Sequence, residues 1–140
     1  MGSENALNKK LNEACHKYQH IYQRFEDKLT GGIPDRLIEV NGQCVWVEGK
    51  QVDDFPKREN TVVLQEKDFR KDQQMFLLGW GAKTNRAFLL TQVKRTYYLH
   101  GWMEVARMHF MGKKEFVESA HFKSGSLDDR FFEALLSYDP

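Results

Sequence analysis

Hydrophobic positions follow a helical period in the first part of the chain. Between Glu4 and Leu29 they recur at alternating spacings of four and three residues, which places them on one stripe of a helix. The stripe consists of Leu7, Leu11, Ala14, Tyr18, Ile21 and Phe25. The sequence Thr30-Gly31-Gly32 follows, and glycine suits the left-handed cap position. The pattern therefore predicts one long helix that ends at these glycines.

The next segment has the pattern of a β-hairpin. Two strand-like runs, Arg36 to Val40 and Gln43 to Glu48, flank the dipeptide Asn41-Gly42. This dipeptide favours a two-residue turn because both of its positions need a positive φ. A polar stretch from Gln51 to Lys67 is predicted to be mostly loop.

Further elements are expected after this loop. A second helix is predicted over Asp68 to Trp80, with Gly79 and Gly81 marking its end. Two strands joined by a turn should follow, and then a helical C-terminal part in which Ser126 has the spacing of a capping box. The predicted ranges are Arg86 to Val93 and Tyr97 to Leu99 for the strands, Lys94-Arg95 for the turn, Met103 to Phe110 for a short helix, and a last helix through Leu136.

Composition limits the class of protein. A chain of 140 residues with 41% hydrophobic and 29% charged residues is expected to form a single globular domain. The net charge of +1 does not by itself indicate nucleic acid, so bound DNA would require positive charge gathered on one face. Cys15 and Cys44 are expected to be free thiols in a reducing compartment. Without a membrane-spanning run or a signal-peptide core, the expected location is a cytoplasm, its own or a host's.

The hairpin turn sets a register with chemical consequences. If Asn41 and Gly42 form the turn, Val40 faces Gln43 and Asp35 faces Glu48. Side chains directly opposed in an antiparallel pair have Cβ atoms about 4.5–5.5 Å apart. Two carboxylates so close repel each other, and a cation would neutralise them. Oxygen ligands of this kind suit Mg²⁺ or Mn²⁺.

Lys50 is expected to join the two acids. It lies two residues beyond Glu48 and shares its face if the strand stays regular through Gly49, whereas a bulge there would turn the lysine away. Metal-assisted hydrolysis of a phosphodiester needs such a set, because the metal activates water and the lysine orients it or stabilises charge on the phosphate. The alternative is a solvated strand face carrying a weak ion pair.

These residues resemble the signature of the PD-(D/E)xK nuclease superfamily. Pro34-Asp35 and Glu48-Gly49-Lys50 match its motif, and Gly32 to Asp35 looks most similar to the short, phage-type VRR-NUC branch. Arg70-Lys71-Asp72-Gln73 resembles the branch's helix, which carries a glutamine near the active site. Trp80 and the run Arg86 to Leu90 also look similar, so that the resemblance spans roughly Phe25 to Leu99.

The resemblance implies a fold and an activity. The fold is α/β, with a restriction-endonuclease-like core in which helices flank a central mixed sheet, here a core of about 5–100 and a helical extension of about 101–140. The activity is Mg²⁺-dependent endonucleolytic cleavage of DNA, with Mn²⁺ as a substitute and no nucleotide cofactor. Asp35 and Glu48 would bind the metal, Lys50 would serve the attacking water, and Gln73 would support the site. The family often adds a glutamate from the first helix, for which Glu26 is the candidate.

Several assignments have a structural alternative. Gln73 lies on the apolar stripe of its helix, where its amide could equally bond nearby backbone. Glu26 could pair at the surface with Lys28 or Arg24, and Glu13 is a second candidate for its role. Two features depart from the family pattern. The gap from Leu29 to Asp35 is too short for the usual intervening strand, and Arg36 is awkward in a buried strand.

Partners follow from charge and size. Basic residues that could contact the DNA backbone are Lys57, Arg58, Arg70, Lys94 and Arg95. A homodimer is expected because a domain this small cuts one strand per site. Junction or flap cutting and site-specific homing both remain open. The alternative function is a non-catalytic module that binds nucleic acid or a protein partner. His16 and His20 have metal-compatible spacing but no evident third ligand.

Overall fold

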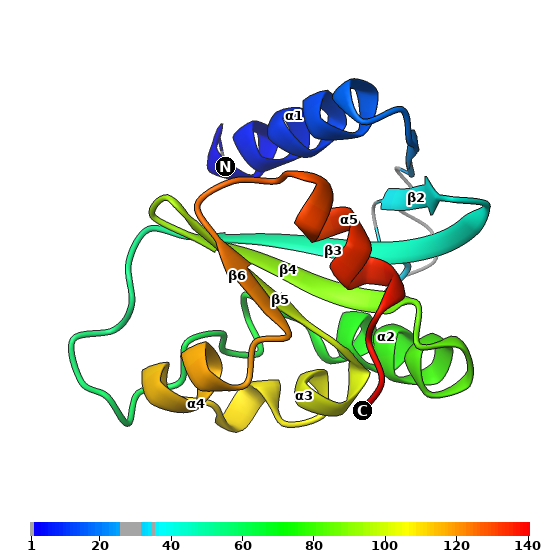
Figure 1. Ribbon diagram of the computed structural model, residues 1–140. Coiled ribbons are helices and arrows are strands. Elements are labelled where there is room, and N and C mark those ends of the chain that lie inside the picture. Colours follow the sequence, from blue (N-terminus) through cyan, green and yellow to red (C-terminus); the bar gives the residue numbers. More distant parts are fainter. Residues whose placement is uncertain (1, 26–31, 35) are drawn as a thin grey trace.

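The computed structural model describes residues 2–25, 32–34 and 36–140. Helices and strands are interspersed along this chain (Figure 1). In chain order they are α1 (Gly2–Lys17), β1 (Ile21–Arg24), β2 (Arg36–Val40), β3 (Gln43–Val52), α2 (Lys71–Thr84), β4 (Ala87–Val93), β5 (Thr96–His100), α3 (Trp102–Val105), the 3-10 helix η1 (Met108–Phe110), α4 (Lys113–Glu118), β6 (Phe122–Ser124) and α5 (Asp129–Leu136).

Within the described residues, six strands form one mixed sheet in the order β1-β2-β3-β4-β5-β6. All neighbours are antiparallel except β3 and β4, which run parallel. Parallel neighbours need a crossover connection, and α2 provides it. The predicted α/β class with a mixed sheet flanked by helices is confirmed. None of the helices in the described ranges is long and apolar enough to cross a lipid bilayer.

The sheet separates two hydrophobic cores, because successive side chains on a strand point to opposite faces. Val45 and Val47 of β3 face the core covered by α1 and α5. Trp46 faces the core covered by α2, α3 and α4. Figure 1 shows the two groups of helices on opposite sides of the sheet. Even-numbered side chains of this part of β3, such as Glu48, therefore face α2, α3 and α4, whereas odd-numbered ones face α1 and α5.

The hairpin between β2 and β3 confirms the predicted turn and register. Asn41 and Gly42 have φ values of 51° and 83°. Val40 pairs with Gln43, and Ile38 pairs with Val45. A positive φ at both turn positions matches the right-handed twist of the flanking strands. The side chains of β3 thus point as the sequence predicted.

The prediction of one long helix up to Leu29 is wrong after Lys17. The helix ends there because Gln19 takes a left-handed φ of 64°, while the His20 amide donates to the Cys15 carbonyl over 2.8 Å. Residues 21–24 form β1 and pair with β2. Pairing with the free edge of β2 stabilises an extended backbone in these residues, even though they could also continue the apolar stripe of a helix. A strand therefore does lie between the first helix and β2, earlier in the chain than the gap from Leu29 to Asp35.

The second helix is shifted from its predicted range. It begins at Lys71 and continues through Gly79 and Gly81 to Thr84, where Asn85 ends it with a φ of 55°. Gly81 does not end the helix but lets it pack closely, since a Cβ atom there would lie 2.8 Å from Cγ of Trp102. The Trp102 indole donates to the Asn85 side chain over 2.8 Å, which ties α3 to the end of α2.

The C-terminal part differs in detail from a purely helical extension. Its strand β6, which the hydrophobic pattern did not predict, pairs with β5 and extends the sheet. The last helix is capped by Asp128, whose carboxylate accepts a hydrogen bond from the Arg130 amide over 3.0 Å. Ser126, the predicted cap, lies two residues too early. Phe131, Phe132 and Leu135 bury this helix against the sheet.

Candidate functional site

Glu48 and Lys50 lie together on one face of β3. The Lys50 ammonium nitrogen is 3.5 Å from the Glu48 Oε2 atom, and only 4% of Glu48 and 8% of Lys50 are exposed. The pairing with β4 continues without interruption through Glu48, Gly49 and Lys50. The bulge at Gly49 that would turn the lysine away is absent from this segment. Strand alternation therefore keeps the acid and the lysine side by side.

Arg36 explains why glycine stands between them. This arginine is 1% exposed and lies on the opposite face, where a Cβ atom added to Gly49 would be 2.8 Å from its Cζ atom. The guanidinium group thus occupies the space that a side chain at position 49 would fill. From the sequence, an arginine in a buried strand was unexpected, and its packing against Gly49 was not predicted. A glycine inside a strand was the available signal, since it often marks the close approach of another group.

Gln73 reaches the same group from α2. Its Nε2 atom donates to the Glu48 Oε2 atom over 3.3 Å, and its Oε1 atom accepts from the Arg70 amide over 3.0 Å. The backbone bond sets which way the amide points. The helix start and the central strand are thereby linked through one side chain. The structure brings Glu48, Lys50 and Gln73 together, and we call these three residues the β3–α2 polar group.

The remaining predicted acids are placed differently. Asp35 and Glu26 lie outside the described residues. Glu13 is exposed on α1, which covers the other face of the sheet and so does not bring it to the β3–α2 polar group. Gly32, with a φ of 91°, packs against the backbone of Asp72 in the first turn of α2. Gly32 therefore lies beside the turn that carries Gln73.

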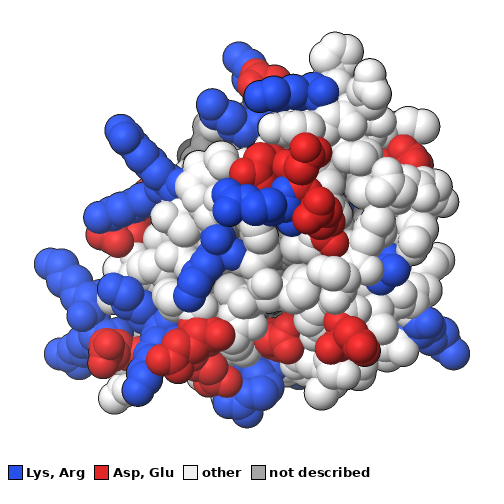
Figure 2. Space-filling view, viewed as in Figure 1, with Lys and Arg blue, Asp and Glu red and all other residues white. Residues whose placement is uncertain are grey.

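The predicted DNA contacts are all exposed. Lys57 and Arg58 lie in the loop after β3, and Arg95 lies in the turn after β4. Arg70 pairs with Asp72 and Lys94 pairs with Asp54, each over 3.2 Å. Basic side chains gather at the left of the molecule in Figure 2, where the loop after β3 runs in Figure 1, with acids between them. This mixture of charges agrees with the small net charge of the chain.

Two buried polar residues beside the group were not predicted. Thr91 of β4 is the register partner of Lys50, and His100 of β5 is the register partner of Leu89. Both are 0% exposed and face the core under α2 to α4. The His100 ring nitrogen Nε2 lies 2.8 Å from the Phe116 carbonyl, and burial lowers the pKa of this histidine to about 4. At neutral pH His100 is therefore an uncharged donor to α4.

We expect His100 to make the protein less stable in acid. An unfolded histidine has a pKa near 6.5, so between that pH and about 4 the unfolded chain binds a proton that the folded chain does not. Stability should then fall as pH falls through this window, by about 3 kcal/mol in total. Urea unfolding of the parent and of His100→Gln, which keeps a donor, would measure it at several pH values. Equal losses for both proteins would contradict the assignment, and His16→Gln should behave as the parent.

The histidines and the buried thiol that the sequence offered as chemical groups are placed away from such roles. His16 is exposed, and His20 packs on Phe132 with ring centroids 4.3 Å apart. Among the described residues, no three or more His, Cys, Asp or Glu side chains cluster so that they could hold a metal ion. Burial raises the pKa of Cys15 to about 12, so this thiol is protonated and a poor nucleophile at neutral pH.

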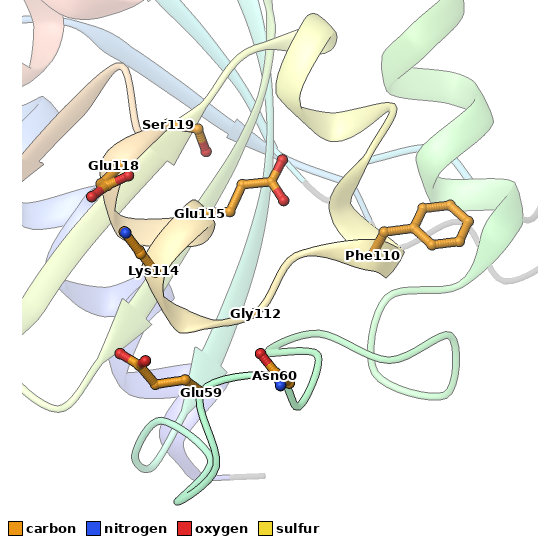
Figure 3. Close-up of a pocket in the computed structure, with 8 residues that line it drawn as sticks. All are labelled: Glu59, Asn60, Phe110, Gly112, Lys114, Glu115, Glu118 and Ser119. Atoms are coloured by element: carbon orange, nitrogen blue, oxygen red, sulfur yellow. The ribbon is translucent and has the colours of Figure 1, made fainter.

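A separate pocket of about 540 Å³ opens between the loop before α2 and the segment around α4 (Figure 3). Its walls include the carboxylates Glu59, Glu115 and Glu118, the ammonium group of Lys114 and the ring of Phe110. Glu115 is bound to Arg107 over 2.8 Å. No residue of the β3–α2 polar group lines this pocket. The pocket therefore adds nothing to the candidate site.

The chain matches no protein-family model, and no curated protein matches it significantly.

Proposed function

We propose that this protein is a metal-dependent endonuclease that hydrolyses DNA phosphodiester bonds. The observation that carries the proposal is the β3–α2 polar group, in which a carboxylate, an ammonium group and an amide are held together below 10% exposure. Burying charged groups costs free energy, and replacing a buried ion pair by well-packed hydrophobic residues of similar volume is often neutral or stabilising. Buried ionisable clusters of this kind are typical of functional sites.

The donor chemistry fits a hard divalent cation. Glu48 presents a carboxylate whose Oε2 atom is held by both Lys50 and Gln73, and carboxylate oxygens suit Mg²⁺ or Mn²⁺. Glu48 and Asp35 would hold the ion, with Glu26 as a further acid. When bound, such an ion offsets negative charge on the phosphodiester and makes water a better nucleophile at neutral pH.

The chain's own residues would position the reactants. The Lys50 ammonium group can hold a water molecule or a phosphate oxygen next to Glu48 and stabilise charge that develops on the phosphate. Gln73 orients the Glu48 carboxylate through its 3.3 Å bond, and the backbone bond to Arg70 fixes the amide in turn. Water attacks directly, so that no covalent intermediate with the protein is required.

The arrangement of elements supports a restriction-endonuclease-like core. β1 occupies the place between the first helix and β2 where that core usually has a strand. The buried Arg36, the other departure from the pattern, is accommodated by Gly49. DNA would approach along exposed cations such as Lys57, Arg58, Arg70, Lys94 and Arg95, and two copies of the chain would cut both strands of a duplex.

Cleavage assays test the proposal directly. Purified protein should nick or cut plasmid or branched DNA in Mg²⁺ or Mn²⁺ and stop when EDTA is added. Glu48→Gln, purified in parallel, should be inactive and thereby exclude a contaminating nuclease. If no DNA form is cut in either metal, the nuclease proposal fails. Binding of DNA without cutting would instead favour a non-catalytic nucleic-acid-binding module.

A further inference from the structure

Four aromatic rings form a cluster beside the β3–α2 polar group. Phe25 follows β1, Trp46 lies on β3, and Phe76 and Trp80 lie on α2. Trp46 is at the centre, with ring centroids 5.6 Å from Phe25, 5.3 Å from Phe76 and 6.0 Å from Trp80. Phe76 and Trp80 are stacked at an interplanar angle of 24°. We call these four residues the aromatic platform.

The platform is partly open to water. Trp80 is 48% exposed and Phe25 is 37% exposed. A cluster of large rings that served only the core would be covered more completely. Contiguous exposed apolar surface on a folded protein commonly marks a binding site.

The platform is continuous with the proposed catalytic residues along two elements. On β3, Trp46, Glu48 and Lys50 alternate onto the same face. On α2, residues three and four apart lie on one stripe, which begins with Gln73 and continues through Phe76 and Trp80. The exposed cation Lys83 lies at the next position of the same stripe. A polymer held at Glu48 and Lys50 would therefore meet the aromatic rings next.

We propose that the aromatic platform binds unpaired bases of the nucleic-acid strand whose phosphodiester lies at Glu48 and Lys50. This inference rests on the nuclease proposal and deepens it, because it gives the substrate class: DNA with unpaired bases next to the phosphodiester that is cut. Aromatic rings stack on any base, and a nearby cation such as Lys83 serves the backbone. Paired bases, stacked inside a duplex, do not offer their faces to the rings.

Binding measured without cleavage tests the inference. In EDTA, fluorescence anisotropy would compare the affinity of the protein for labelled oligodeoxythymidine and for a labelled duplex. Trp80→Ala should weaken binding of the oligonucleotide by about 5- to 100-fold and that of the duplex by much less. Trp80→Phe keeps a ring and should retain most of the affinity. Phe110→Ala is the matched control, since it removes a ring that is 76% exposed on η1.

Three outcomes would overturn the inference. The first is a parent protein that does not bind oligodeoxythymidine. The second is an equal loss for both ligands, or no loss, in Trp80→Ala. The third is a change of solution mass in Trp80→Ala, which would identify the face as an interface between copies. A failure of the nuclease proposal is distinguishable, because it would leave these affinities in EDTA intact while Mg²⁺ still gives no cleavage.

Discussion

Replacing Lys50 by methionine is expected to lower the rate of Mg²⁺-dependent DNA cleavage by about 100- to 1000-fold, the cost of removing one donor that stabilises transition-state charge. Methionine preserves the length of the side chain and removes only the ammonium group. The loss should appear in kcat, since the lysine acts on charge that develops during the reaction. Cleavage of a labelled branched DNA under single-turnover conditions would measure it.

The Lys50 variant needs a check on folding and a matched lysine. Removing the ammonium group takes one partner from the buried Glu48, so some loss of stability is expected as well. Circular dichroism and urea unfolding would show whether the variant is folded at the assay temperature. Lys67→Met, an exposed lysine in the loop before α2, should cut at the parent rate. A folded Lys50→Met protein that cuts as fast as the parent would refute the role given to this residue.

Gly49→Ala should damage both stability and cleavage. The added methyl group meets the buried Arg36 guanidinium, which is 1% exposed and has little room to move. Overpacking of this kind costs about 1–3 kcal/mol. If the strand shifts instead, Lys50 moves with it, and a misplacement of about 1 Å can cost about 100-fold in rate. Urea unfolding and single-turnover cleavage would measure the two effects.

Two further variants test whether the effect of Gly49→Ala comes from contact with Arg36. One is a control at Gly79, and the other replaces Arg36 itself. Gly79 lies inside α2, and a Cβ atom added there would meet no atom within 4 Å beyond the helix's own backbone and the two adjacent residues, so Gly79→Ala should stabilise the protein by about 1 kcal/mol. Arg36→Met should reduce the penalty of Gly49→Ala, with a coupling energy of about 1 kcal/mol or more. If Gly49→Ala is as stable as the parent, or if the two changes are additive, Arg36 is not the group that excludes a side chain at position 49.

The hairpin shows how much local chemistry decides. Asn41 and Gly42 favour a turn that only residues tolerant of positive φ can make, so the register of β2 and β3 follows from two residues. Strand alternation then places Glu48 and Lys50 on one face if the strand stays regular through Gly49, and the uninterrupted pairing with β4 shows that it does. The predicted support from Gln73 also depends on local information, since its position on an apolar helical stripe indicated that the amide would need a partner.

The first helix shows where local chemistry is insufficient. Ile21 and Phe25 continue the apolar stripe of Leu7, Leu11 and Ala14, yet β1 takes residues 21–24. The helical stripe and the strand are both compatible with the sequence, and pairing with β2 chooses between them. The same reason explains β6, whose three residues carry no strong pattern and are extended because they pair with β5.

The sequence by itself thus determined the hairpin turn and its register, which place Glu48 and Lys50 two residues apart on one strand, and it predicted the helix that carries Gln73. These depend on turn geometry and on the two-residue and 3.6-residue periods, which act between neighbours in the chain. Only the tertiary structure decided that all three groups are buried together, that Arg36 is packed over Gly49, and that four aromatic rings lie beside them. Those contacts join residues far apart in sequence, and their energies depend on the surfaces that the fold brings together, which no local pattern records.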